Sequence, residues 1–300
     1  MDLGNFPIVM KPNLAAIDRA MRAFAARGAW LFEDIIAGGL VSLVNSIYWL
    51  LSHIPWFALV ALVFVLGWKA RGKVRSGALY ALMLCLVGVV GLWQLMHMTL
   101  SIVLASVLIA LLIGFPIGIL LSASARATRI MRPVLDTMQT MPVFVYLIPA
   151  LLLFGMGSAS AVIATVIYAI VPVIRLTNLG LRQVDEGVVE ASQAFGSTRW
   201  QTLVKVQIPQ AMPTIMAGVN QTLMMAMAMV VTCSMIGARG LGNEVLIAVN
   251  RTEIGRGLVS GFSVVILAVL LDRLTQGWFD EDKRARRMAV EAKSGGEADG

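Results

Sequence analysis

Fifty consecutive residues, 76–125, contain no Asp, Glu, Lys or Arg. A soluble domain carries about 25% charged residues, so a run of this length is typical of a chain whose solvent is lipid. The whole chain of 300 residues shows the same deficit, with 58% hydrophobic and 14% charged residues. Because a spanning helix needs about 20 apolar residues, the sequence predicts an all-α integral membrane protein that crosses the bilayer several times.

Uncharged runs indicate seven spans. They cover approximately residues 50–68, 77–95, 99–121, 141–155, 159–178, 214–236 and 258–278. Basic segments at 69–75, 126–132, 175–182 and 283–287 are each separated from the next by two of these spans. The positive-inside tendency then predicts an outer N-terminus and an inner C-terminus, whereas an eighth span at 35–52 would put the N-terminus inside.

Composition divides the chain into four regions. Residues 1–49 are expected to be amphipathic and interfacial, because apolar residues of 13–34 recur at helical spacing among charged ones. Residues 50–95 hold the first two spans. Residues 96–278 form the core of the membrane domain, with a cytoplasmic loop at 179–213, and 279–300 form a charged cytoplasmic tail that we expect to be disordered.

The polar stretch 190–209 interrupts the apolar sequence. Its first part suits a helix with small side chains, because Ala191 and Ser192 follow Glu190. Gly196 then suits the residue after the helix end, where a left-handed backbone is common.

A second short helix is predicted to follow. Thr198 and Gln201 match a capping box, and Pro209 is expected to end this helix because proline has no amide hydrogen. The local chemistry fits both a solvated helical loop and a surface on which another protein docks.

The sequence offers no catalytic or metal-binding constellation. His53 and His97 stand alone. A phosphate-loop pattern at 67–73 has Val74 where the motif requires a hydroxyl, and it follows a predicted span rather than a strand. We therefore expect no enzyme activity and no cofactor in this chain. The positive charge lies in short segments between spans, which argues against nucleic-acid binding.

Several uncharged polar residues lie inside or beside the predicted spans. They join helices through hydrogen bonds or line a solute pathway, and both alternatives stay open for Gln139, Thr140, Asn220, Gln221, Thr232 and Ser234. A proton-driven carrier is expected to keep an ionisable residue at mid-membrane, and the sequence shows none. Energy for active transport would then have to come from elsewhere.

The polar stretch resembles the EAA loop of permease subunits in binding-protein-dependent ABC importers. That pattern reads Glu-Ala-Ala, three residues, Gly, nine residues and Ile-x-Leu-Pro. The matching residues are Glu190, Ala191, Gly196 and Pro209, with conservative departures at Ser192, Val206 and Ile208. Segments 136–142, 174–178, 217–222 and 236–242 are similar to the osmoprotectant branch, which imports glycine betaine, proline betaine or choline.

The resemblance implies the MetI-like fold of type I importers and a location in the bacterial cytoplasmic membrane. It also implies three kinds of protein partner: a second permease copy in a homodimer, cytoplasmic ATPase subunits that bind ATP and Mg, and an external substrate-binding protein. Glu190, Ala191, Ser192 and Gly196 would form the ATPase-coupling surface, with Val206, Ile208 and Pro209 fixing the next turn. The alternatives are a permease for another small amino-acid-like solute and a self-sufficient secondary carrier.

Overall fold

The computed structural model describes residues 13–296, and for Ile17 and residues 277–296 it describes the backbone alone. The described range is helical, without strands. Its elements are α1 (Leu14–Arg27), η1 (Trp30–Ala37), α2 (Gly38–His53), α3 (Trp56–Arg71), α4 (Val74–Val89), α5 (Trp93–Ser122), α6 (Ala125–Thr140), α7 (Val143–Phe154), α8 (Ser158–Arg182), α9 (Glu186–Ala194), α10 (Arg199–Thr202), η2 (Leu203–Gln207), α11 (Ile208–Thr232), η3 (Cys233–Ile236), α12 (Leu241–Arg251) and α13 (Ile254–Gly296).

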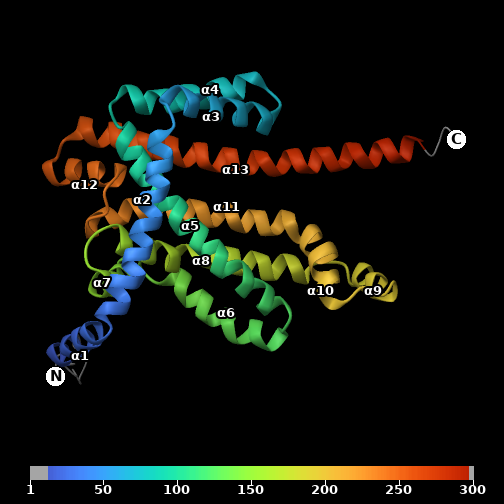
Figure 1. Ribbon diagram of the computed structural model, residues 1–300, viewed down its shortest axis with the longest axis horizontal. Helices are drawn as coiled ribbons and strands as arrows, with labels where there is room; N and C mark the ends of the chain where they lie inside the picture. Colours follow the sequence, from blue (N-terminus) through green and yellow to red (C-terminus); the bar gives the residue numbers. More distant parts are fainter. Residues whose placement is uncertain (1–12, 297–300) are drawn as a thin grey trace, which may run out of the picture.

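The centre of the molecule is a bundle in which α8 packs between α5 and α11 (Figure 1). The helix α13 runs alongside α11, and the α3–α4 hairpin packs against α13. The helix α2 crosses the bundle at a steep angle to α8 and α11. The short helices α9 and α10 lie at one end of the bundle, and α12 lies at the other. Polar segments thus sit at both ends of an apolar middle.

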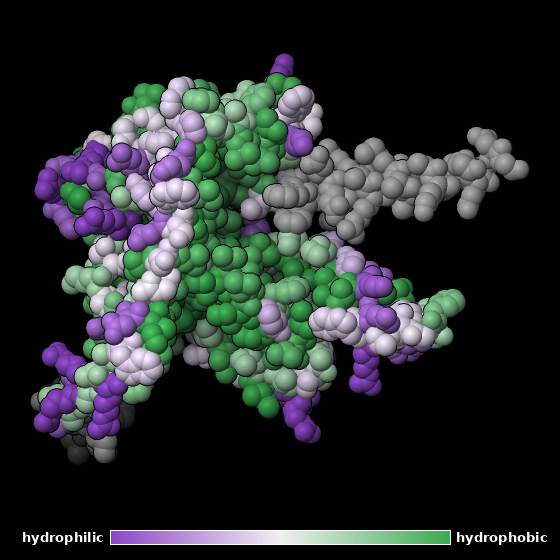
Figure 2. Space-filling model, in the orientation of Figure 1, coloured by the Kyte–Doolittle hydropathy of each residue, from purple (hydrophilic) through white to green (hydrophobic). Residues whose placement is uncertain are grey.

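Hydropathy follows this arrangement (Figure 2). Apolar residues cover the visible middle of the bundle, and hydrophilic residues gather near α12 and near α9. Large apolar side chains point outward along the bundle helices, including Leu112, Leu120 and Ile148. An apolar belt between two polar ends matches the environment of a bilayer.

Among the described residues, five helical stretches are long and apolar enough to cross a membrane: Trp30–His53, Trp93–Ser122, Ser158–Arg182, Arg199–Ile236 and Ile254–Gln276. The pair α6 and α7 makes a sixth if it is counted as one span, and it is bent by 93°. The predicted span at 141–155 is therefore only part of a broken helix, because Pro142 and Met141 interrupt the helix between α6 and α7.

The first two predicted spans are short helices. Both α3 and α4 contain 16 residues, which is about 24 Å of helix and less than the roughly 30 Å of a hydrocarbon core. Conversely, residues 36–48 of the region 1–49, which was predicted as interfacial, belong to the 24-residue stretch Trp30–His53. The number of seven spans and the outer N-terminus stay predictions.

The two ends of the chain compare differently with the predictions. The amphipathic helix is present as α1, whose N-cap residue Asn13 accepts a hydrogen bond from the Ala16 amide at 3.1 Å. Residues 279–296, for which we expected disorder, instead continue α13. Their Glu, Ala, Lys and Arg residues are strong helix formers. Residues 1–12 and 297–300 of the two predicted terminal regions lie outside the described residues.

Glycines let the central helices approach closely. A Cβ atom added at Gly118 of α5 would lie 2.6 Å from Cβ of Thr177 and 3.0 Å from the carbonyl oxygen of Ile174, both on α8. On the other side of α8, a Cβ at Gly218 of α11 would lie 2.9 Å from Cβ of Leu176. Real Cβ atoms do not come this close, so both contacts require glycine. Small residues at helix contacts are the usual way to gain packing energy in lipid.

Gly118→Ala is expected to destabilise the bundle by about 1–3 kcal/mol, because the added methyl group overpacks the α5–α8 contact. The matched control is Gly39→Ala in α2, where nothing lies within 4 Å of the added atom. Alanine favours a helix over glycine, so this control should unfold at the same or a higher temperature. Thermal unfolding of the purified chain in detergent measures both. Equal midpoints for Gly118→Ala and the unsubstituted chain would contradict the packing argument.

Candidate functional site

The helix α9 begins and ends with local hydrogen bonds. At its start, the Asp185 carboxylate accepts a hydrogen bond from the Gly187 amide at 2.8 Å. At its end, the amide of Gly196 donates to the carbonyl of Gln193 at 2.9 Å, and the amide of Ser197 donates to the carbonyl of Ser192 at 3.2 Å. This pair of bonds is a Schellman motif, and Gly196 has the left-handed φ of 85° that the motif requires. The prediction that Gly196 follows the end of this helix with a left-handed backbone is confirmed.

The capping box is also confirmed. The Gln201 amide donates to the Thr198 hydroxyl at 3.3 Å, and the Thr198 amide donates to the Gln201 side chain at 2.9 Å. A hydrogen bond of 3.0 Å between the hydroxyls of Ser192 and Thr202 joins α9 to α10. The two short helices therefore form one unit, with Ser192 facing inward rather than toward solvent.

The prediction that Pro209 ends the second helix is wrong. The chain stays helical from α10 through the π-helical segment η2 into α11, which begins at Ile208. Proline is tolerated in the first turn of an α-helical segment, where its missing amide hydrogen is least needed. Pro209 therefore lies inside one continuous helical rod, Arg199–Ile236. Val206 and Ile208 lie along this rod and are half-buried.

The surface of α9 and α10 carries two highly exposed aromatic residues among polar and small side chains. No residue of α9 is buried, and Glu190, Ala191 and Gly196 are all exposed. Phe195 is 92% exposed and Trp200 is 72% exposed. Neither residue was predicted from the sequence, although two aromatic residues beside a glycine turn in a polar loop are a usable signal. Large exposed aromatics are typical of protein–protein contacts.

The loop is held at its base by the bundle. Gly180 near the end of α8 packs against Ala211 near the start of α11, and Leu181, Ala211 and Ile215 form a small buried cluster there. Beside this base lies a groove with a volume of about 690 Å³, and Glu190 is among its lining residues. A force on α9 would therefore act on α8 and α11 together.

The six residues predicted to line a pathway do not form one cluster. Gln139 and Thr140 are exposed at the end of α6, and Gln221 is exposed in α11. Thr232 and Ser234 donate to carbonyl groups of their own helix at 3.2 and 2.7 Å. Within the described residues no hydrogen bond joins any two of the six. Their lining role stays a prediction.

Asn220 has a different role in this structure. Its side chain donates to Asp272 at 2.8 Å and accepts from Thr275 at 3.0 Å, so it connects α11 with α13. Gln276 donates to the same carboxylate oxygen of Asp272 at 2.6 Å. Asn220 thus joins helices, which is one of the two alternatives that the sequence left open.

A second polar connection between helices was not predicted. Asp136 of α6 forms an ion pair with Arg175 of α8. The local sequence does not indicate this pair, because Arg175 lies 39 residues further along the chain. The pair fastens the outer helix α6 to the central helix α8.

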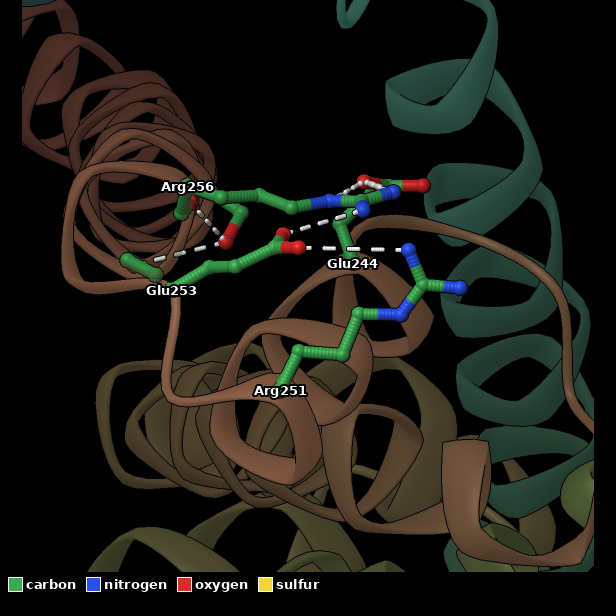
Figure 3. A network of polar contacts seen from close by, with 6 residues as sticks. Glu244, Arg251, Glu253 and Arg256 are labelled. Carbon is green, nitrogen blue, oxygen red and sulfur yellow. Dashed lines mark hydrogen bonds and ion pairs between the residues drawn. The ribbon is translucent and has the colours of Figure 1, made fainter.

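At the opposite end of the bundle, charged residues fix the turn between α12 and α13 (Figure 3). The Arg256 guanidinium lies 2.7 Å from the Glu244 carboxylate and 3.3 Å from that of Glu253. Arg251 approaches Glu253 at 3.9 Å. These charges compensate one another at this turn.

The family model of binding-protein-dependent transport system inner membrane components matches residues 110–282. A glycine betaine/carnitine transport permease protein of Listeria monocytogenes is 46% identical over 250 residues, which cover 82% of this chain and 89% of the relative. A glycine betaine/proline betaine transport system permease protein of Escherichia coli is 46% identical over 244 residues, which cover 81% of this chain and 68% of the relative.

The fold is similar to that of a solved chain of the MetNI methionine ABC transporter in an inward facing conformation. The TM-score is 0.54 at 25% sequence identity, and the match covers 65% of this chain and 95% of the solved chain. The similarity concerns the fold alone.

Gly196→Ala is expected to loosen the end of α9, because a left-handed backbone costs a residue with a Cβ about 1–2 kcal/mol. Hydrogen exchange of the α9 amides should become about tenfold faster. Gly196→Asn is the matched control, since asparagine tolerates this backbone, and its exchange rates should stay near those of the unsubstituted chain. Equal acceleration by both substitutions would show that the backbone conformation is not the cause.

Proposed function

The chain belongs to the family of binding-protein-dependent transport system inner membrane components, and we propose that it carries a quaternary-amine compatible solute such as glycine betaine, proline betaine or choline. It is a multi-pass protein of the cytoplasmic membrane, with the MetI-like fold of type I ABC importer permeases. It is a transport permease rather than an enzyme.

The solute class rests on one observation. The chain is 46% identical to a glycine betaine/carnitine permease along 82% of its length, and a glycine betaine/proline betaine permease matches it equally well. A quaternary ammonium group is recognised through aromatic faces. In our proposal this selection occurs in a separate binding protein, and the chain supplies the passage.

The surface of α9 and α10 is our proposed docking site for the ATPase. Its support is the combination of a rigid, capped helix pair with exposed Phe195 and Trp200. Both ends of this unit continue into central helices that pack against each other. Closure of a docked partner would thus shift α8 and α11, as in other hinge and shear transitions. The side that carries α9 is then cytoplasmic.

The remaining partners follow from this arrangement. ATP and Mg would bind to the ATPase subunits and not to this chain. The end that carries α12 would face outward and receive the loaded binding protein. A second copy of the permease would complete the pathway as a homodimer in the bilayer.

Uptake of labelled glycine betaine tests the solute and the energy source. The permease, its ATPase and its binding protein are reconstituted in proteoliposomes with or without enclosed ATP. We expect accumulation only with ATP and binding protein, and competition by unlabelled quaternary amines. Accumulation without ATP would establish the alternative of a secondary carrier. Competition by amino acids but not by betaines would establish the alternative of another small amino-acid-like solute.

Phe195→Ala tests the docking surface. The side chain is almost fully exposed, so its loss should leave the fold intact but weaken ATPase association about 30-fold, as for a central interface residue. Met156→Ala is the matched control, because Met156 is an exposed apolar residue in the turn between α7 and α8 at the other end. Association is measured by co-purification and by titration of labelled ATPase. Unchanged association for Phe195→Ala, with normal uptake, would refute the docking role of this residue.

A further inference from the structure

A cavity with a volume of about 660 Å³ lies between α6 and α8. Four arginines line it: Arg129 and Arg132 from α6, and Arg175 and Arg182 from α8. We call it the arginine cavity. It lies near the turn between α5 and α6 and the end of α8, at the same end of the bundle as α9. Neither the predicted coupling surface nor the predicted pathway includes these arginines.

The positive charge of the arginine cavity is only partly compensated. Asp136 pairs with Arg175. In the part of the chain that the structure describes, no ion pair involves Arg129, Arg132 or Arg182. Like charges around one cavity repel one another, and a bound anion would reverse the sign of this energy. The site is therefore electrostatically suited to an anionic ligand.

The hydrogen-bond donors of the arginine cavity suit phosphate oxygens. A guanidinium presents its N–H groups as a planar fork that matches phosphate geometry. Asn178 also lines the cavity, and its carbonyl oxygen accepts a hydrogen bond from Thr128 at 3.4 Å. Among the described residues the amide hydrogens of Asn178 make no hydrogen bond, so they can serve a ligand.

The rest of the lining is apolar. Leu121, Leu135 and Leu179 contribute to the walls. On the same helix α6, Ile130 is 65% exposed and Val134 is 49% exposed. A free phosphate ion gains nothing from contact with apolar side chains. A phospholipid, in contrast, combines a charged headgroup with acyl chains that can pack against them. Basic pockets between membrane helices are known to suit acidic lipid headgroups.

We propose that the arginine cavity binds the phosphate of an anionic phospholipid, with the acyl chains lying along Ile130 and Val134. The lipid would bridge the outer helix α6 to the central helix α8, next to the ion pair of Asp136 and Arg175. The assignment of this lipid to the inner leaflet rests on the proposed orientation. The binding itself does not depend on which solute is carried.

The test uses the purified full-length chain in a neutral detergent. Native mass spectrometry records the lipid occupancy while phosphatidylglycerol or phosphatidylcholine is added. The double variant Arg129→Gln/Arg132→Gln removes two charges from the arginine cavity. The matched control Arg71→Gln/Arg75→Gln removes two charges from the exposed basic turn between α3 and α4. Thermal unfolding of each variant checks that the fold is retained.

We expect the unsubstituted chain to prefer phosphatidylglycerol and the cavity variant to bind it about 30-fold more weakly, at roughly fivefold per arginine. The control should change by less than about threefold. The variant Arg129→Lys/Arg132→Lys keeps both charges but loses the guanidinium fork, so it should fall between the other two. If the glutamine variant unfolds, the lipid affinity of the lysine variant is compared with that of the unsubstituted chain instead.

Three results would overturn the proposal. Equal weakening in the cavity variant and the control would show that lipid binds to any basic surface. Equal binding of phosphatidylglycerol and phosphatidylcholine would show that the phosphate charge is not recognised. Displacement of the lipid by equimolar inorganic phosphate or glycine betaine would assign the cavity to a soluble ligand. Solute uptake is not part of the readout, so failure here leaves the transport function untouched.

Discussion

The structure depends on the close packing of α8 between α5 and α11. Lipid tails offer no hydrophobic gain when one apolar helix meets another, so helices in a membrane associate through contact area and hydrogen bonds. Gly118 and Gly218 provide that contact by letting backbone approach backbone on opposite sides of α8. The polar connections of the outer helices, Asn220 to Asp272 and Asp136 to Arg175, are built around this centre.

The same packing explains how a movement of the loop between α8 and α11 would be transmitted to both helices. The loop carries its own hydrogen bonds, from the cap at Asp185 to the capping box at Thr198, and the bundle holds it at its base. Its two ends enter helices that already contact each other at Gly180 and Ala211. The loop is thus rigidly attached to a packed pair of helices. Such an attachment transmits a displacement better than a flexible linker does.

Much of this arrangement could be predicted from local patterns. Uncharged runs located α5, α8, α11 and α13, and the spacing around Gly196 and Thr198 predicted the end of α9 and the start of α10. Long-range pairing could not be predicted. Asp272 lies 52 residues from Asn220, and the local sequence around either residue does not indicate its partner. The prediction that Pro209 ends a helix was wrong. Proline disfavours the interior of a helix, but here a new α-helical segment begins after the π-helical segment η2, and Pro209 lies in its first turn. The exposure of Phe195 could not be predicted either, because it depends on the turn that separates α9 from α10.

The π-helical segment η2 determines how α10 is rotated about the helix axis relative to α11. In an α-helix each residue turns the chain by about 100°, and a π segment adds a residue without adding a full turn. The five residues Leu203–Gln207 therefore set the direction in which α10 points relative to the buried face of α11. The direction of the proposed docking surface is therefore set by the helix type of residues next to it as well as by its own residues.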